Sequence, residues 1–480
     1  MNSELEPIIL DSKPRSQKIT GNVIFAASVA VIGSSFQFGY NTGVINAPEL
    51  IIEQFYNQTY LIRYHKYISA TNLKVLWALT VSIFAVGGMF GSFLAGYMAN
   101  YFGRRKSLLI NNLFAIVGVL LMTTSKLAGS YEMIILGRFV IGINCGLNTG
   151  LAPLYLTEIA PIEYRGMFGT LNQMGVVTAL LLSQILGLPQ VLGNSVLWPI
   201  LFAVPALFGF YQVFGLKFCV DSPSYLFGKG MHENGIEALV WLRGTGDIEE
   251  DIQNIRSEQS NNSETFGFVQ LIKNRCLFQP LIVAIVMQCS QQLSGINAVF
   301  YYSTSIFVAA GVPVVMSTYI TVGMGVANVV MTTISVSLIE KVGRRTLHLI
   351  GLGGMFFCAV GLVFSLTLGI QWVSAVAVIL FVIFFQTGPG SIPWFITAEL
   401  FDEAARPTAI SIAGLVNWTG NFIVGIAYPP LALAIHGYTF IIFAILLFIF
   451  FVFTYFKVPE TKGKTIHEIS LYFDPSAVKS

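Results

Sequence analysis

Twelve long apolar runs, most of them free of charged residues, constrain this 480-residue chain more than any other feature of its sequence. The hydrocarbon core of a bilayer is about 30 Å thick, so a helix needs about 20 apolar residues to cross it. The runs are continuous and lack the alternation of a barrel strand. We therefore predict an all-α membrane protein with twelve transmembrane helices, centred in residues 22–46, 75–98, 107–125, 133–154, 167–188, 197–217, 277–302, 313–338, 347–368, 373–397, 408–434 and 438–457.

The composition excludes a soluble enzyme of several domains. Only 10% of the residues are charged, whereas soluble domains carry roughly a quarter. The net charge of +2 gives no basic surplus for a nucleic acid, and the sequence contains no G-x-x-x-x-G-K-[ST] loop for ATP. The five cysteines do not form the pattern of a disulfide framework. We expect no metal and no cofactor.

The charged residues divide the chain and orient it. Residues 218–276 are polar and separate six apolar runs from six, so we expect a cytoplasmic N-terminus (1–21), a six-helix bundle (22–217), a cytoplasmic helical linker (218–276), a second six-helix bundle (277–457) and a cytoplasmic tail (458–480). Basic residues are enriched on the cytoplasmic side of membrane proteins. With both termini in the cytoplasm, only five of the 26 basic residues lie towards the outside: Arg63, Lys66, Lys74, Lys126 and Arg138.

This topology selects one glycosylation sequon of three. The Asn-x-Ser/Thr sequons begin at Asn57, Asn261 and Asn417. In the predicted topology the second is cytoplasmic and the third lies inside a membrane helix. Asn57 is therefore the predicted acceptor of an N-linked glycan.

The two halves of the chain repeat one pattern of polar residues. The Gly-Arg-Arg triplet at 103–105 returns at 343–345, 240 positions later. Four further pairs recur at spacings of 239 to 241: Pro153 with Pro393, Glu158 with Glu399, Arg165 with Arg406, and Asp221 with Glu460. Both members of each pair fall on the same side of the membrane. The halves are therefore predicted to be parallel repeats, the architecture of an alternating-access transporter.

An ordered set of motifs carries a resemblance to a known family. The motifs are GYMANYFGRR (96–105), EIAPIEYRG (158–166), QQLSGIN (291–297), EKVGRR (340–345), GPGSIPW (388–394) and PETKGKT (459–465). With them the chain resembles, from about residue 20 to 470, the sugar porters of the major facilitator superfamily, and most closely the animal facilitative glucose transporters. The resemblance implies the major facilitator fold of two six-helix bundles, a hexose substrate and a plasma-membrane location.

Charged residues gather at the predicted inner ends of the helices. Topology alone explains part of the basic residues, but it explains neither the acidic ones nor their duplication. In the family that the chain resembles, such clusters form ion pairs between the halves when the inner side is closed. We expect this cytoplasmic gate to comprise Arg104, Arg105, Glu158, Arg165, Glu340, Arg344, Arg345, Glu399 and Arg406.

Three amides share one face of the seventh run. Gln288, Gln291 and Gln292 have the i, i+3, i+4 spacing of a helix face. Amides inside a membrane need hydrogen-bond partners. From periodicity alone, hydrogen bonding between helices and binding of a substrate are equally supported.

The same run contains a predicted break at Ser294-Gly295. Transporters build binding sites where membrane helices are discontinuous. A break would bring Asn297 and Phe300 towards the amide face. Tyr301 and Tyr302 then lie towards the outside, where they resemble the outer-gate aromatics of the family.

Neutral polar side chains in other runs fit the hydroxyl groups of a sugar, since amides both donate and accept hydrogen bonds. By resemblance the sugar contacts are Gln173, Gln291, Gln292, Asn297, Asn328 and Trp394, and the apolar lining includes Val176, Leu180, Phe300 and Phe385. Gln386 and Asn417 are further polar candidates, although packing and binding are equally supported for Asn417 and Trp418.

Three positions depart from the pattern of the family. Gln386 stands where glucose facilitators usually have Glu, Ser391 replaces a usual proline, and Ser224 stands where the PESPR-like motif has its arginine. The role of a charge at position 386 and the place of the bend in the tenth helix are therefore open.

The sequence predicts transport without ion coupling. No Asp or Glu lies in the middle of a predicted run, and Asn41 stands where proton-coupled relatives have Asp. The one embedded charge, Arg138, does not release a proton in a protein. We expect a uniporter for D-glucose and similar hexoses. Membrane lipid surrounds it, and one monomer is sufficient for transport. The alternatives are a fructose-preferring facilitator, which Trp394 argues against, a proton-coupled symporter, a sugar receptor that does not transport, and an exporter of organic ions.

Overall fold

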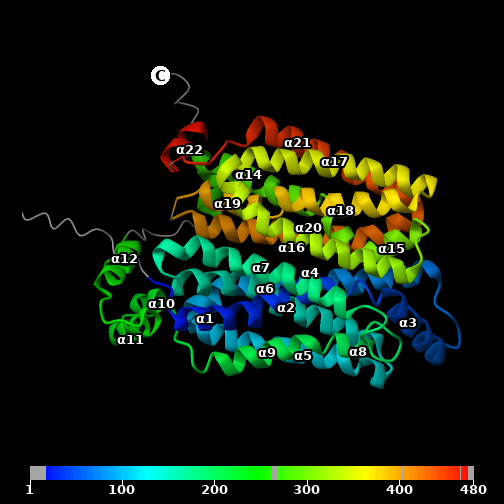
Figure 1. Cartoon of the computed structure of the whole chain (residues 1–480), viewed down its shortest axis with the longest axis horizontal. Helices are drawn as coiled ribbons and strands as arrows, with labels where there is room; N and C mark the ends of the chain where they lie inside the picture. The colour runs from blue at the N-terminus through cyan, green and yellow to red at the C-terminus, as the bar shows by residue number, and fades with distance from the viewer. Residues whose placement is uncertain (1–17, 261–267, 403, 465, 474–480) are drawn as a thin grey trace, which may run out of the picture.

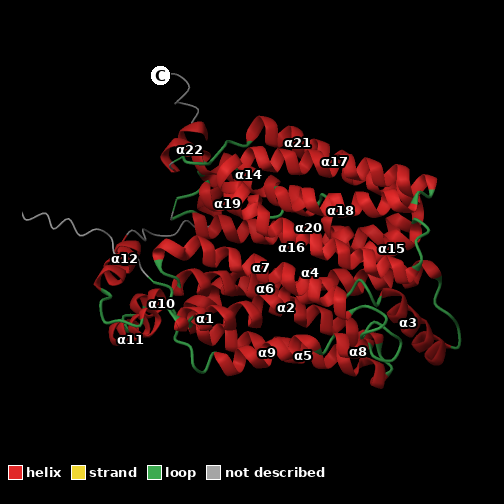
Figure 2. Cartoon of the chain, in the orientation of Figure 1, coloured by secondary structure: helices red, strands yellow, loops and turns green. Residues whose placement is uncertain are grey.

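The computed structural model describes residues 18–260, 268–402, 404–464 and 466–473, and these residues form helices joined by short loops (Figures 1 and 2). The N-terminal half holds α1 (Gly21–Ala30), η1 (Val31–Ser35), α2 (Phe36–Gly43), α3 (Glu49–Tyr64), α4 (Ala70–Phe102), α5 (Arg104–Ala128), α6 (Tyr131–Ile159), η2 (Ile162–Tyr164), α7 (Arg165–Leu186), α8 (Trp198–Leu201) and α9 (Val204–Gly215).

The linker carries four short helices, α10 (Pro223–Gly228), α11 (His232–Arg243), α12 (Glu249–Ser260) and α13 (Phe268–Lys273). The C-terminal half holds α14 (Arg275–Gln292), α15 (Ile296–Ala309), α16 (Val314–Val342), α17 (Arg344–Leu368), α18 (Gln371–Thr387), α19 (Ile392–Glu399), α20 (Arg406–Ile435), η3 (His436–Tyr438) and α21 (Thr439–Lys457), and α22 (Ile466–Phe473) follows it.

The helices confirm the all-α membrane fold. Eleven helical stretches are long and apolar enough to cross a membrane, and the last of them, Arg406–Lys457, contains both α20 and α21, which gives twelve crossings within the described residues. The sixth predicted run is divided between α8 and α9. Pro205, in the first turn of α9, has no backbone N–H to donate to a preceding turn of helix. Several helices extend beyond the predicted runs. For example, α4 begins at Ala70 and ends at Phe102.

The two halves lie side by side along their length. In Figure 1 the helices from α1 to α9 form the lower half and those from α14 to α21 the upper half. The halves meet where α4 packs against α20 and α7 packs against α16. The linker helices α10 to α12 and α22 lie at one end of the molecule, and α3 and α8 lie at the other (Figure 1).

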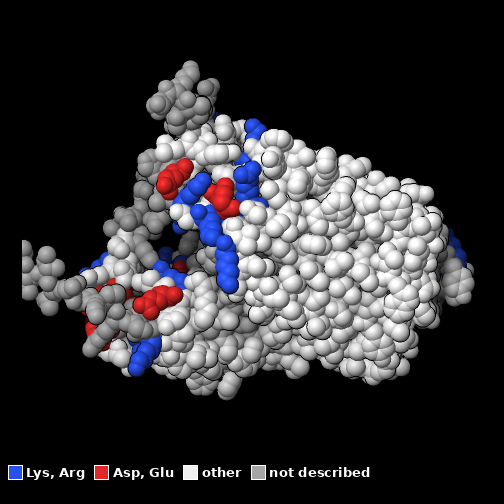
Figure 3. All heavy atoms as spheres, turned by 45° about the horizontal axis from the view of Figure 1, so that its top comes forward, with Lys and Arg blue, Asp and Glu red and all other residues white. Residues whose placement is uncertain are grey.

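The charge distribution fits a membrane belt. Figure 3 shows charged side chains gathered in two groups at the end that carries the linker and α22, with the surface hollowed between them, and no charged side chain on the middle of the face in view. Large apolar side chains are exposed on the flanks of the helices, among them Phe93, Leu113, Phe210 and Phe357. Lipid is the solvent that suits such a surface.

The repeat found in the sequence has a structural basis at two helix starts. Asp221 Oδ1 accepts hydrogen bonds from the backbone N–H of Arg104 at 3.0 Å and of Arg105 at 3.2 Å. In the second half Glu460 accepts from the backbone N–H of Arg344 at 2.8 Å and of Arg345 at 3.1 Å. The first N–H groups of a helix have no partner within the helix and carry a partial positive charge. Each carboxylate therefore caps a membrane helix, α5 or α17.

These caps predict an effect on stability. We expect Asp221→Ala and Glu460→Ala each to lower the free energy of unfolding by about 1 kcal/mol, the usual cost of removing an N-cap side chain. The midpoint of thermal unfolding of the purified protein in detergent measures this effect. Glu237→Ala, at an exposed position on α11, is the control for loss of a cytoplasmic carboxylate. Equal midpoints for all three variants and the unmodified protein would contradict the capping role.

Candidate functional site

The seventh membrane-spanning segment is broken at the predicted place. Helix α14 ends at Gln292, Gly295 has a φ of +92°, and α15 begins at Ile296. A Cβ atom on Gly295 would lie 2.7 Å from the Phe443 ring, and L side chains rarely adopt this φ. Glycine is therefore needed at the break. The sequence prediction of an interruption at Ser294-Gly295 is confirmed.

The break gathers five amide side chains, which we call the amide cluster: Gln288, Gln291 and Gln292 of α14, Asn297 of α15 and Asn417 of α20. Asn417 Nδ2 donates to the side-chain oxygens of Gln288 at 2.8 Å and Gln291 at 2.5 Å. Gln292 Nε2 donates to Asn417 Oδ1 at 2.9 Å, and Asn297 Nδ2 donates to Gln292 Oε1. The five members of the cluster come from three helices and carry no charge.

The tenth membrane-spanning segment meets the amide cluster at a second break. Helix α18 ends at Thr387, Gly388 has non-helical angles, and α19 begins at Ile392. Gln291 Nε2 donates to the carbonyl oxygens of Pro389 at 2.8 Å and Gly390 at 2.7 Å. Backbone carbonyls freed inside a membrane need donors from elsewhere in the protein. One glutamine therefore satisfies both carbonyls of the interrupted helix.

A second pair of amides lies between α16 and α18. Gln386 Nε2 donates to Asn328 Oδ1 at 2.5 Å. The Ser335 hydroxyl donates to the backbone carbonyl of Gln386. Nearby on α15 and α18, the Phe300 and Phe385 rings meet edge to face with centroids 6.2 Å apart.

Some buried polar atoms of these groups have no hydrogen-bond partner in the described structure. They are Gln288 Nε2, Asn328 Nδ2 and Gln386 Oε1. An unsatisfied buried polar group costs about 1 to 3 kcal/mol. Two donors and one acceptor of these groups are thus left unsatisfied in this conformation.

Two of the predicted contact residues stand apart from these amides. Gln173 lies half-buried on α7 of the other half, and Trp394 lies on α19 with 37% of its surface exposed. The structure describes no hydrogen bond between either side chain and the amide cluster. Trp418 packs across the halves against Phe38 and Phe84, with ring centroids 5.8 Å away in both cases, which favours packing for this residue.

At the end remote from the linker helices, Asn46 joins the two halves. This residue follows α2, and its Nδ2 donates to the Phe300 carbonyl at 2.9 Å and to the Ser303 hydroxyl at 2.6 Å. Its Oδ1 accepts from the Thr304 backbone N–H at 3.1 Å. Nothing in the sequence marked Asn46, because two of its three partners are backbone atoms.

Both predicted outer-gate tyrosines are buried in this structure. Tyr301 donates to Asn421 Oδ1 and Tyr302 donates to the Gly425 carbonyl, each at 2.9 Å. Their partners lie on α20 of the same half. The tyrosine contacts thus lie within the C-terminal half, and Asn46 supplies the described hydrogen bonds between the halves at this end.

At the end that carries the linker helices, the two described ion pairs of the predicted gate lie within single halves. Arg104 makes two hydrogen bonds of 2.7 Å to the Glu158 carboxylate. In the other half Arg344 donates to Glu399 Oε1 at 3.0 and 3.1 Å. Of the remaining gate residues, Arg105, Arg345 and Arg406 donate to backbone carbonyls of their own halves. The side chain of Glu340 lies outside the described residues.

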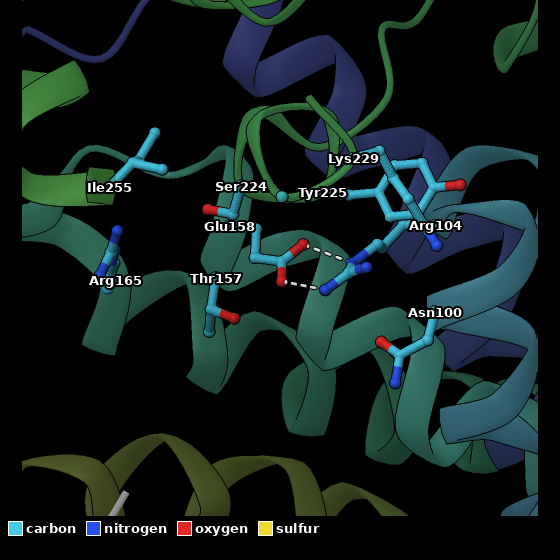
Figure 4. A pocket seen from close by; sticks show the side chains of 10 residues that line it. Asn100, Arg104, Thr157, Glu158, Arg165, Ser224, Tyr225, Lys229 and Ile255 are labelled. Carbon is cyan, nitrogen blue, oxygen red and sulfur yellow. Dashed lines mark hydrogen bonds and ion pairs between the residues drawn. The ribbon is translucent and has the colours of Figure 1, made fainter. Parts of the chain in front are cut away.

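A cavity of about 450 Å³ opens beside the first of these ion pairs (Figure 4). Figure 4 shows Arg104 joined to Glu158, with Tyr225 and Lys229 beyond Arg104 and Arg165 on the opposite side. The cavity is lined by the N-terminal half and the linker alone. It is therefore separate from the amide cluster.

The sequon residue Asn57 lies on α3, at the end of the molecule remote from the linker helices (Figure 1). Its side chain is half-buried, and its Oδ1 is covered.

Comparisons with known proteins converge on one family. A family model described as "Sugar (and other) transporter" matches residues 26–473. The chain is 50% identical over 467 residues to facilitated glucose transporter member 3 of solute carrier family 2 from Ovis aries, with 95% of this chain and 94% of that protein covered. It is 48% identical over 467 residues to member 1 from Gallus gallus, with the same coverage of both chains.

Solved structures show the same fold at lower identity. The inward open conformation of the xylose transporter XylE from E. coli matches with a TM-score of 0.80 and 24% identity, covering 94% of this chain and 100% of that one. A partially occluded inward open conformation of XylE matches with a TM-score of 0.77 and 22% identity, covering 92% of this chain and 100% of that one.

The amide cluster makes a prediction about stability. We expect Asn417→Ala to lower the free energy of unfolding by about 1 to 2 kcal/mol, because it leaves the oxygen of Gln288 and the amide of Gln292 without their partner. Thermal unfolding in detergent measures this effect. Thr419→Ala, two residues further along α20, is the control that removes only a hydroxyl bonded to its own helix. If the two variants unfold at the same midpoint, Asn417 is not the centre of the cluster.

Proposed function

The chain belongs to the sugar transporter family, and on that premise we propose that its neutral amide cluster binds D-glucose and related hexoses between two halves that open in turn. The protein is a facilitative glucose transporter and not an enzyme, as its relatives indicate at 48% to 50% identity over nearly the whole chain. The observation that carries the proposed site is the set of amides at two broken membrane helices.

The chemistry of the amides suits a hexose. Each sugar hydroxyl donates one hydrogen bond and accepts others, and each carboxamide can do both. A sugar at the amide cluster would offer hydroxyls to the unpartnered atoms of Gln288, Asn328 and Gln386. Hydrogen bonds between the sugar and the amides would replace hydrogen bonds between the amides. The number of hydrogen bonds would therefore change little on binding and release. The edge-to-face pair of Phe300 and Phe385 would cover an apolar face of the ring.

The proposed sugar contacts come from both halves. The C-terminal half supplies most of them, and the N-terminal half supplies Gln173 on α7, which packs against α16. Trp394 on α19 is exposed in this conformation, and we propose that it meets the sugar on the inward path. The full set is Gln173, Gln291, Gln292, Asn297, Phe300, Asn328, Phe385, Gln386, Trp394 and Asn417.

The unequal ends of the molecule support alternating access. The outer end has hydrogen bonds between the halves through Asn46, whereas the described inner ion pairs, Arg104 with Glu158 and Arg344 with Glu399, lie within single halves. We propose that the inner charged residues change partners to close the inner side when the outer side opens. We propose the same change of partners for the other residues of the cytoplasmic gate, Arg105, Arg165, Glu340, Arg345 and Arg406.

The proposed mechanism is uniport. The amide cluster contains no carboxylate that could exchange a proton during the cycle. Asn41, at the place of the aspartate in proton-coupled relatives, is buried and donates to the Gln37 carbonyl at 2.8 Å. Its own backbone carbonyl accepts from Arg138 Nη1 at 2.8 Å. A neutral amide at this position gives the cycle no titratable step.

We further propose where the protein works. It is a multi-pass membrane protein, and the plasma membrane with both termini in the cytoplasm fits the distribution of its basic residues. Asn57 then faces the outside as the glycan acceptor. The same topology divides the chain into five segments, at 1–21, 22–217, 218–276, 277–457 and 458–480. We also propose that one monomer contains the whole transport path.

The uniport mechanism predicts the response to a proton gradient. In proteoliposomes, labelled glucose should equilibrate to the same internal concentration with and without an imposed pH gradient, and preloading with unlabelled glucose should give a transient counterflow. Time courses of internal label measure both effects. Steady accumulation above equilibrium that depends on the gradient would contradict uniport.

The proposed site predicts a selective loss of affinity. We expect Gln291→Leu to raise the Km for glucose by about fivefold, because a hydrogen bond to a polar ligand is worth about 1 kcal/mol. Gln371→Leu, at the outer start of α18, is the matched control with the same change of side chain, and its Km should stay unchanged. The site assignment fails if Gln291→Leu lowers only the maximal rate and leaves Km at the value of the control.

A further inference from the structure

A buried charged cluster lies at the outer end of the molecule, apart from the amide cluster. Two carboxylates of α3, Glu49 and Glu53, are 3% and 7% exposed. Lys74 of α4 lies beside them, and Ser305 of α15 completes the group. Charged residues are seldom buried to this extent without a partner. We call these four residues the outer carboxylate cluster.

The distances connect one carboxylate to both halves. Lys74 Nζ lies 3.1 Å from Glu49 Oε1 and 2.6 Å from Glu53 Oε1. The other oxygen of Glu49, Oε2, accepts a hydrogen bond of 2.5 Å from the Ser305 hydroxyl. Helices α3 and α4 belong to the N-terminal half and α15 to the C-terminal half. Glu49 is thus paired within its own half and bonded across to the other.

The ammonium group of Lys74 reduces the repulsion between the two carboxylates. Glu49 and Glu53 are four residues apart on one helix, where like charges repel. Burial raises the pKa of Glu53, and the neighbouring Glu49 raises it further, whereas Lys74 lowers it. The ammonium group between the two carboxylates offsets their repulsion and fixes the direction of the Glu49 side chain.

The position of Ser305 makes this bond depend on the conformation. Asn46 contacts Phe300, Ser303 and Thr304 on α15, and Ser305 is the next residue of the same helix. Helix α15 also carries the gate residues Tyr301 and Tyr302. Movement of α15 away from the N-terminal half, which opening of the outer side requires, would separate Ser305 from Glu49. The bond therefore belongs to the outer-closed state.

We propose that Glu49, oriented by Lys74, is a positioning residue of the transport cycle that holds α15 through Ser305 and so favours the empty carrier with its outer side closed. The proposal rests on the alternating-access function proposed above. Neither carboxylate is among the proposed sugar contacts.

The expected effect is a shift of populations. A contact made in only one of two states changes their ratio by its own free energy. In a carrier with equal intrinsic affinity on its two faces, whose empty form reorients faster than its loaded form, the ratio of Km for entry to Km for exit equals the ratio of inward-facing to outward-facing empty carriers. Loss of the Glu49–Ser305 bond should therefore lower the entry-to-exit Km ratio.

The test compares sugar entry and exit in cells that express each variant, with labelled glucose on one side only. We expect Ser305→Ala and Lys74→Met each to lower the entry-to-exit Km ratio by about fivefold, since hydrogen bonds to charged groups are among the stronger ones. Lys74→Arg should restore the ratio because it keeps the cation. Lys126→Met is the control, since Lys126 is another outer cation and donates only to backbone carbonyls of its own half.

The outcomes separate this inference from the function on which it rests. An unchanged Km ratio in both Ser305→Ala and Lys74→Met, with maximal rates equal or lowered in both directions together, would overturn the proposal. A merely structural role of Lys74 would lower the amount of active carrier and leave the ratio alone. Failure of the unmodified protein to move glucose would instead contradict the proposed function.

Discussion

A helix that breaks inside a membrane must find partners for its freed carbonyls, and here the side chain of Gln291 supplies them. Its amide donates to the carbonyl oxygens of Pro389 and Gly390, where α18 gives way to α19. Gln291 stands on α14, just before the break at Gly295. Two interrupted helices are thereby tied together by one neutral side chain. The remaining amides of the cluster collect around this link.

In the proposed site, one set of residues would both hold the helices and bind a sugar. When a sugar binds, a neutral hydrogen bond to a sugar hydroxyl would replace a neutral hydrogen bond between two amides. The net change in free energy from hydrogen bonding is therefore small. A charged group in the same place would keep its counter-ion or require a coupled ion. The neutral amide cluster therefore fits the proposed carrier, which releases its substrate without a coupled ion.

The sequence predicted the parts of the fold that depend on hydropathy and repetition. The twelve crossings and the break at Ser294-Gly295 followed from apolar runs and from a glycine beside polar residues. The matching caps of Asp221 and Glu460 were visible as a pair about 240 positions apart. Such features are set by the bilayer and by duplication, so they can be found without knowing how the helices pack.

Pairings between helices could not be predicted in the same way. The acceptors of Gln291 and two of the partners of Asn46 are backbone atoms, which every residue has. Arg104 could have paired with any acid at the inner face, and its choice of Glu158 depends on packing within one half. Glu49 gave no signal beyond its acidity, because its partners Lys74 and Ser305 come from distant parts of the chain.

Distances between the ends of the two halves test the account most directly. Spin labels at the exposed positions Leu127, near the end of α5, and Trp372, near the start of α18, would report on the outer end. Labels at Tyr101 and Tyr455, near the ends of α4 and α21, would report on the inner end. Pulsed electron spin resonance with and without glucose would then give the populations at each end. Alternating access predicts that the outer distance lengthens in the molecules whose inner distance shortens. Fixed distances at both ends in a protein that still transports glucose, or changes of the same sign at both ends, would contradict it.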